Sequence, residues 1–247
     1  MKRKASTILA DDPIAPTSRG SMDRQRAETL SNIAFERLRA EVVSGNLAPG
    51  EKLHVEQLGQ RYGISLSPVR EALSRLSETG LVIAELQRGY RVAPMSIEEY
   101  RDIIETRLHI ETEALRRSLK AGDLEWEAAV VASYHRLSRV HAQVEAGRPE
   151  ALEEWTKLNR EFHAAIISAC GSKWMMRFCL TLYDQTGRYH RRTRLNGTLP
   201  LEQSAREHKA LFRAVLERNT RQAARILEAH VRSAAARVER GEPTLRG

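Results

Sequence analysis

After Pro94 the sequence carries apolar residues at a helical period, and no segment alternates like a β-strand. Glycine, asparagine or proline interrupts the pattern repeatedly, so each helix is followed by a short loop. Helices joined by short loops are antiparallel neighbours that bury their apolar faces against one another. We therefore expect an all-helical antiparallel bundle in residues 96–240. Its six helices are expected at 97–120, 124–146, 152–169, 172–194, 201–218 and 220–240.

Residues 25–95 predict a smaller domain of a different architecture. A first helix is expected to begin at Leu30, and a second one ends at Gly63. Ser67 is the expected N-cap of a third helix, with Pro68 in its first position. Two short strands and the turn between them are expected at 81–84, 90–92 and Gln87-Arg88-Gly89. Three helices followed by a hairpin outline a winged helix-turn-helix, so the predicted fold class is mainly α.

The chain length and composition set the remaining boundaries. A chain of 247 residues is long enough for two domains of ordinary size. Residues 1–24 lack periodicity and are expected to form a flexible arm, with 241–247 as a C-terminal tail. No apolar run approaches the ~18 residues of a membrane span, and no signal peptide is recognisable. We therefore expect a cytoplasmic protein in which Cys170 and Cys179 are small buried side chains without a disulfide.

The net charge of +8 suggests a nucleic-acid partner, but its distribution weakens that argument. The segment 23–95 holds ten Lys and Arg against nine Asp and Glu, a net charge of only +1. Phosphate binding depends on where cations lie and not on their sum. The fold and its motifs must therefore carry the prediction of DNA binding.

A specific series of motifs runs from Gly45 to Val92. Its members are Gly45-Asn46-Leu47-Ala48-Pro49-Gly50, Leu53, Ser67-Pro68-Val69-Arg70-Glu71-Ala72-Leu73, Leu76, Gly80-Leu81 and Arg88-Gly89. This series resembles the GntR family of bacterial transcriptional regulators. The helical segment is similar to the FCD effector-binding domain of its FadR-like subgroup, on Asn159, Phe162-His163, Gly171-Ser172, Glu207-His208 and His230. The resemblance implies a homodimeric DNA-binding regulator, more often a repressor, that responds to a small effector.

The third helix of a helix-turn-helix places its N-terminal residues against base edges in the major groove. The residues expected there are Ser65, Leu66, Ser67 and Arg70. Arg70 can donate two parallel hydrogen bonds to guanine, although a solvated arginine paired with Glu71 or Ser74 would look the same in sequence. Leu66 departs from the arginine common in the family, so the operator sequence does not carry over. Arg88 and Gly89 are expected at a minor-groove contact, with an exposed hairpin charge as the alternative.

Three of the eight histidines lie on apolar helix faces. These are His163, His208 and His230, and Asn159 shares the face of His163 one turn earlier. Burying each polar side chain costs about 1–3 kcal/mol unless it finds a partner. Separate hydrogen bonds would satisfy them, but three histidines on three helices with an oxygen ligand favour one shared divalent metal, Zn²⁺ or Ni²⁺. The metal-binding FCD domains that this segment resembles imply the same four ligands.

The neutral Asn159 replaces an aspartate common in such sites, which leaves more positive charge on the metal and favours a small carboxylate effector. Arg107 and Arg188 are candidates for a second anionic group of that effector. The sequence around Glu111, Trp126 and Trp174 also resembles regulators of short dicarboxylate breakdown, of the glutarate type.

Two other functions remain open from the sequence. A zinc hydrolase would need a general base beside the metal, and Glu207 is expected on a different helix face from His208. A metal-free regulator would use the bundle only for dimerisation. We expect a homodimer on a near-palindromic operator, because one small domain buries too little surface for tight specific binding.

Overall fold

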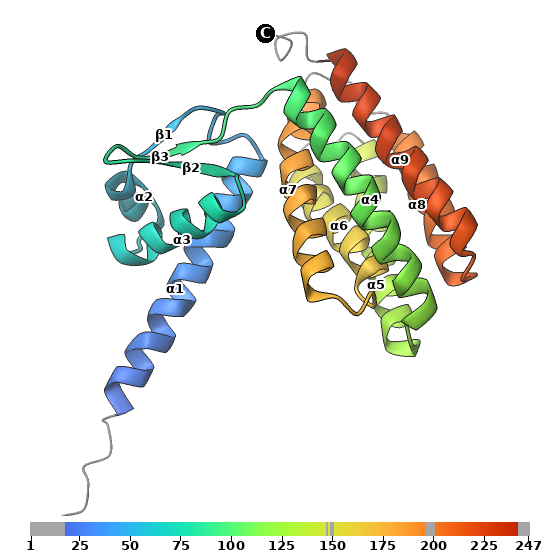
Figure 1. The fold of residues 1–247 in the computed structure, drawn as a ribbon, viewed down its shortest axis with the longest axis horizontal. Helices are drawn as coiled ribbons and strands as arrows, with labels where there is room; N and C mark the ends of the chain where they lie inside the picture. The colour runs from blue at the N-terminus through green and yellow to red at the C-terminus, as the bar shows by residue number, and fades with distance from the viewer. Residues whose placement is uncertain (1–17, 147, 149–150, 196–200, 242–247) are drawn as a thin grey trace, which may run out of the picture.

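The computed structural model describes residues 18–146, 148, 151–195 and 201–241, which form two bodies joined by a short linker (Figure 1). The smaller body holds three helices and a three-stranded sheet, and the larger holds six helices. Each has its own apolar core, as two domains require. None of the helices in the described ranges combines the length and apolarity that a bilayer crossing requires.

The smaller domain has the predicted order of helices and hairpin. Its elements are α1 (Ser18–Val43), β1 (Lys52–Leu53), α2 (Val55–Tyr62), α3 (Leu66–Glu78), β2 (Val82–Glu85) and β3 (Gly89–Val92). The strands are antiparallel in the order β1-β3-β2, with Lys52 opposite Arg91 and Val82 opposite Val92. This is the winged helix-turn-helix arrangement that the sequence predicts.

Three local predictions for this domain are wrong. The first helix begins at Ser18 and not at Leu30, so the last residues of the predicted arm 1–24 are helical; residues 1–17 lie outside the described residues. Strand β1 was not predicted, because two residues carry no periodic signal. Ser65, and not Ser67, is the N-cap of α3. Pro68 is nevertheless tolerated, since the first four helical N–H groups have no partner within the helix.

The larger domain is the predicted six-helix bundle, and every helix end lies within two residues of its expected position. The helices are α4 (Ile97–Ala121), α5 (Leu124–Glu145), α6 (Ala151–Ile167), α7 (Lys173–Leu195), α8 (Leu201–Leu216) and α9 (Thr220–Gly241). Ser96 caps α4 by accepting a hydrogen bond from the Glu99 amide, and Asp123 caps α5 through the Trp126 amide. The expected tail, apart from Gly241, lies outside the described residues.

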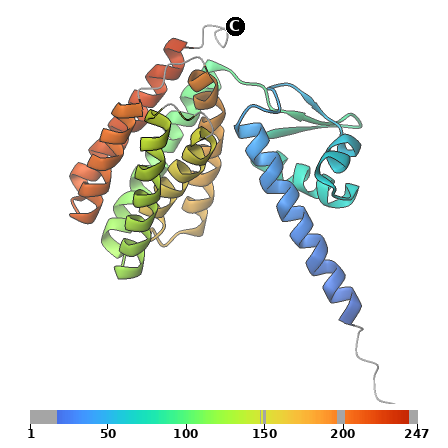
Figure 2. The same cartoon turned by 180° about the vertical axis from the view of Figure 1, so that it is seen from behind.

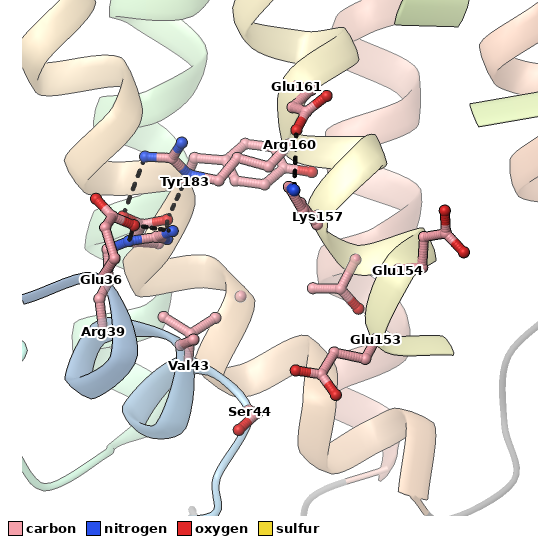
Figure 3. A pocket seen from close by; sticks show the side chains of 14 residues that line it. Glu36, Arg39, Val43, Ser44, Glu153, Glu154, Lys157, Arg160, Glu161 and Tyr183 are labelled. Atoms are coloured by element: carbon pink, nitrogen blue, oxygen red, sulfur yellow. Dashed lines mark hydrogen bonds and ion pairs between the residues drawn. The ribbon is translucent and has the colours of Figure 1, made fainter. Parts of the chain in front are cut away.

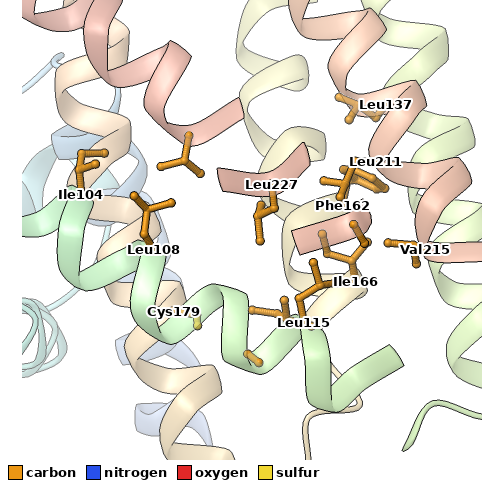
Figure 4. Packing of buried hydrophobic residues seen from close by; sticks show 14 of the residues in the cluster. Ile104, Leu108, Leu115, Leu137, Phe162, Ile166, Cys179, Leu211, Val215 and Leu227 are labelled. Carbon is orange, nitrogen blue, oxygen red and sulfur yellow. The ribbon is translucent and has the colours of Figure 1, made fainter. Parts of the chain in front are cut away.

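The apolar core of the bundle is built from residues of all six helices, α4 to α9 (Figure 4). Leu115, Phe162, Ile166, Leu211 and Leu227 are all fully buried there. Cys170 and Cys179 are buried free thiols, as predicted. This core fixes the rotation of each helix, and therefore which polar side chains point inward.

The two domains meet along α7, the bundle helix that lies beside α1 in both views (Figures 1 and 2). Gly187 is the point of close approach, since a Cβ atom there would lie 2.9 Å from Val43 Cγ1. The contact is otherwise polar, with Arg39 of α1 donating to Asp184 of α7. Polar interfaces of this kind permit relative domain motion.

Candidate functional site

The leading end of α3 is exposed, as expected for a helix that enters a DNA groove. The opposite face of α3 is buried against α1 and α2 through Val69, Ala72, Leu73 and Leu76. Packing of that face leaves Ser65, Leu66, Ser67 and Arg70 together in solvent. Arg70 pairs with Glu56 of α2 at 3.7 Å, and both side chains are more than 60% exposed. Such a surface pair is worth little, so the guanidinium is available to a ligand.

The hairpin between β2 and β3 forms an exposed tip beside this helix. Arg88 and Gly89 lie at the tip and are both exposed. Gln87 and Gly89 adopt positive φ angles of 59° and 89°, and glycine takes this conformation without strain. Leu86, also at the tip, is 92% exposed, which the sequence analysis did not single out. The tip can therefore approach a DNA backbone or minor groove closely.

The three predicted histidines meet inside the bundle, each from a different helix. His163 lies on α6, His208 on α8 and His230 on α9, and one ring nitrogen of each lies within 4.8 Å of the others. The Nε2 atoms of His163 and His208 are 3.4 Å apart. Two nitrogens bound tetrahedrally to zinc at about 2.0–2.1 Å would lie roughly 3.3 Å apart. The separation of these two nitrogens is therefore compatible with two ligands of one metal ion.

Each of these rings is held through its other nitrogen. The Nδ1 atom of His163 lies 3.2 Å from a Glu111 carboxylate oxygen, and that of His230 lies 2.7 Å from Glu207. His208 Nδ1 lies 3.3 Å from the Nε2 atom of His141, a fourth buried histidine. Partners of this kind fix ring orientation and make the imidazole a better metal ligand. The Nε2 atoms of His163 and His208 are thereby left to face each other at the centre.

Burial keeps the imidazoles of His163 and His208 neutral, the form that metal binding requires. Desolvation lowers the pKa of His163 to about 4, although Glu111 opposes this shift. Desolvation, reinforced by the other histidines, holds the pKa of His208 well below its ordinary value. Burial alone would raise the pKa of Glu111, but Arg107 and His163 outweigh burial and lower it to about 2. Glu111 is therefore an anion next to a neutral His163.

Asn159 lies one helical turn before His163 on α6. Its amide nitrogen donates to the hydroxyl of Tyr183, while its Oδ1 is buried without a hydrogen-bond partner. An orphaned buried oxygen costs about 1–3 kcal/mol. A metal ion would satisfy Oδ1, so the donor set of three imidazoles and one amide oxygen fits Zn²⁺ or Ni²⁺.

Comparison with known proteins identifies both domains. Residues 30–92 match the bacterial regulatory proteins of the gntR family, and residues 102–233 match the FCD domain. The chain belongs to the GntR family. This GntR protein is accordingly a DNA-binding transcriptional regulator of the FCD type, and the resemblance found in its sequence is confirmed.

Relatives of this GntR regulator are similar to it over most of its length. The HTH-type transcriptional regulator BphR of Paraburkholderia xenovorans is 43% identical over 205 residues, 83% of each chain. The HTH-type transcriptional repressor GlaR of Escherichia coli is 37% identical over 198 residues, 78% of this chain and 89% of the relative. The solved structure of E. coli McbR/YncC has a TM-score of 0.72 at 19% identity, covering 85% of this chain and 97% of that one, which supports the fold. These relatives are regulators, which excludes the hydrolase alternative.

The two arginines predicted to hold the effector lie in different places in this GntR regulator. Arg107 is buried beside the histidines, paired with Glu111 at 2.6 Å and stacked over the Tyr183 ring at 4.7 Å. Arg188 is also buried, but it donates to Gln185 and to the backbone oxygens of the interdomain linker. The structure therefore brings Arg107 to the site and places Arg188 at the domain junction, where it donates to Gln185 and to the linker carbonyls. The assignment of Arg188 to the effector stays a prediction.

Three residues of the site escaped the sequence analysis. His141 was not among the predicted residues, although it follows Leu137 by one turn on a buried face. Glu207 was expected to face away from the site, but it binds His230 from the next helix. Glu111 lies four residues after Arg107, an i, i+4 spacing typical of an ion pair, and this was the available signal. Trp126 lies in the core and Trp174 is exposed, so neither belongs to the site.

Proposed function

We propose that this GntR regulator is a repressor whose DNA affinity is controlled by a small carboxylate metabolite. The metabolite binds a divalent metal held by Asn159, His163, His208 and His230. The observation that carries the proposal is the approach of one ring nitrogen from each of three buried histidines to within 4.8 Å, while their Nδ1 atoms lie next to Glu111, Glu207 and His141. Among the described hydrogen bonds, the Nε2 atoms of His163 and His208 have only each other as partners, at 3.4 Å, and a metal ion would bind both.

The charge of the site favours an anionic ligand. Arg107 and Glu111 neutralise each other, the histidines and Asn159 are neutral ligands, and Glu207 contributes one negative charge. A divalent ion therefore leaves the centre with a net charge of about +1, which a carboxylate oxygen can neutralise by coordination. The metal would supply a Lewis-acidic binding point. Arg107, which donates to Glu111 and Thr186, would become a second donor to the ligand by exchanging one of these contacts.

On the DNA side, the proposal assigns base contacts to the leading end of α3. Ser65, Leu66, Ser67 and Arg70 would enter the major groove, and Arg88 and Gly89 would contact the minor groove. One such domain covers a single half-site, so a homodimer on a near-palindromic operator follows. Repression is proposed from the name of the relative GlaR, which is a repressor.

Native mass spectrometry with elemental analysis of the purified protein tests the metal and the dimer together. One zinc or nickel ion per chain is expected, and a chelator should remove it. Glutarate, a short dicarboxylate, is then added to the metal-loaded protein on its operator, and the DNA dissociation constant is measured. A protein that binds DNA equally well with and without metal and glutarate would instead have a bundle that only dimerises.

A further inference from the structure

One segment of α7, Tyr183–Arg188, contacts both the histidine site and the DNA-binding domain. Its inward side meets the site. The Tyr183 hydroxyl accepts a hydrogen bond from Asn159, and the Tyr183 ring lies 5.5 Å from that of His163. Thr186, one turn later, accepts from Arg107 at 3.2 Å. Tyr183 and Thr186 therefore form one wall of the proposed metal and effector site.

The outward side of the same segment holds the DNA-binding domain. Asp184 accepts from Arg39 of α1 at 3.0 Å. Gln185 donates to the carbonyl of Thr79, at the C-terminal end of α3, at 2.8 Å. Arg188 donates to the carbonyls of Ala93 and Pro94 in the linker. Three consecutive contacts thus connect one turn and a half of α7 to α1, to the end of the DNA-reading helix and to the linker.

Asp184 also binds the bundle itself. Arg160 of α6 donates to its two carboxylate oxygens at 2.7 and 3.3 Å, and Arg160 directly follows Asn159 in the sequence (Figure 3). Two neighbouring contacts therefore join α6 and α7 at the same height in the bundle. Asn159 and Tyr183 make the contact that faces the site. Arg160 and Asp184 make the contact that faces α1. The Asp184 side chain is only 8% exposed, so it cannot give up both arginines without a desolvation penalty.

A cleft of about 820 Å³ lies beside these contacts, between α1 on one side and α6 and α7 on the other. Its lining is largely charged, and Glu153 of α6 points into it from across the gap from Val43 of α1 (Figure 3). Beside the cleft, α1 meets α7 at the close approach of Val43 to Gly187 and through the hydrogen bond from Arg39 to Asp184, so contacts with α7 help to determine where α1 lies. Space for α1 to move is already present.

We infer that the segment Tyr183–Arg188 couples occupancy of the histidine site to the position of the DNA-binding domain, with Asp184 as the connecting residue. A ligand that displaces Asn159 or Tyr183 changes the α6–α7 spacing at this level. Asp184 moves with both arginines, and α1 and the end of α3 follow. The inference rests on the proposed function for the ligand, but the coupling itself belongs to these contacts.

Hydrogen exchange of the full-length protein with and without Zn²⁺ tests the coupling. In the unmodified chain, zinc should slow exchange in α6, α8 and α9, and should also change it at Thr79, at the linker and along α1. A change of about fivefold or more is expected, the lower end of typical coupling between sites. Asp184→Asn should keep the effect of zinc on the bundle and lose the effect on the DNA-binding domain. Glu113→Gln, which removes an exposed ion pair with Arg117, is the control and should keep both effects.

Zinc protection confined to the bundle of the unmodified chain would overturn the inference, as would a distant effect that survives in Asp184→Asn. Zinc that changes nothing in the bundle would argue against the proposed metal site instead. In that case the coupling is tested by comparing the unmodified chain with a variant of the DNA-binding domain, both without metal, since coupling between two sites is reciprocal. Arg39→Gln changes a residue of the DNA-binding domain and should alter amide hydrogen exchange in the segment from Asn159 to His163 of the metal-free protein. A change restricted to the DNA-binding domain would overturn the inference.

Discussion

Replacing His208 by alanine isolates the contribution of the metal to stability. His208 is fully buried and its Nε2 lies 3.4 Å from that of His163, so the substitution removes one of three imidazole ligands. A metal at 100 times its dissociation constant stabilises the folded state by about 2.7 kcal/mol. For a chain of this size each kcal/mol shifts the melting temperature by roughly 2–4 °C. Removing the metal from the unmodified protein should therefore lower its melting temperature by about 5–11 °C.

The assay is thermal unfolding of the unmodified chain, of His208→Ala and of a control variant, each with free Zn²⁺ at 100 times its dissociation constant and with a chelator. The substitution also leaves a cavity and removes the contact of His141 with His208, but that cost is present in both samples and cancels in the difference. The unmodified chain should show the chelator-dependent shift, and His208→Ala should lose it. His135→Ala, an exposed histidine on α5, is the matched control and should keep the full shift. Equal shifts in all three proteins, or none in the unmodified chain, would refute the metal site.

Four further outcomes follow from the structure. Arg70→Ala should weaken specific DNA binding by about 1–3 kcal/mol in fluorescence anisotropy, and an equal loss on random DNA would reduce Arg70 to a phosphate contact. Asn159→Asp should tighten zinc in a chelator competition, because it supplies a charged oxygen; unchanged affinity would show that Oδ1 is not a ligand. Metal-free protein should lose stability as the pH falls from about 6.5 to about 4, since His163, whose pKa is lowered to about 4 by burial, stays neutral when folded while the unfolded chain takes up the proton. The loss from His163 is at most about 3 kcal/mol, and a flat melting temperature over that range would contradict it. Light scattering should give about twice the chain mass of 28.0 kDa, and a monomer would exclude the two-half-site arrangement.

The sequence by itself determined the helices of the bundle and the faces that they bury. Amphipathic periodicity is a local property, so both ends of each of the six helices could be predicted to within two residues. The same periodicity placed His163, His208 and His230 on inward faces, and the structure brings them together. The leading end of α3 was equally predictable, because Val69, Ala72, Leu73 and Leu76 fix which side of that helix is buried.

Only the tertiary structure decided what each buried polar group meets. His141 binds His208 and Glu207 binds His230 across helix pairs, so these contacts depend on the crossing and rotation of two helices at once. The sequence alone makes Arg188 a candidate for binding the effector, but in the folded chain its guanidinium donates to the backbone carbonyls of the linker. Strand β1 forms because Lys52 pairs with Arg91 of β3, about forty residues later in the chain. A periodic pattern encodes which face of a helix is apolar, but the partner of a polar atom is set by segments distant in the chain, whose approach the hydrophobic core determines.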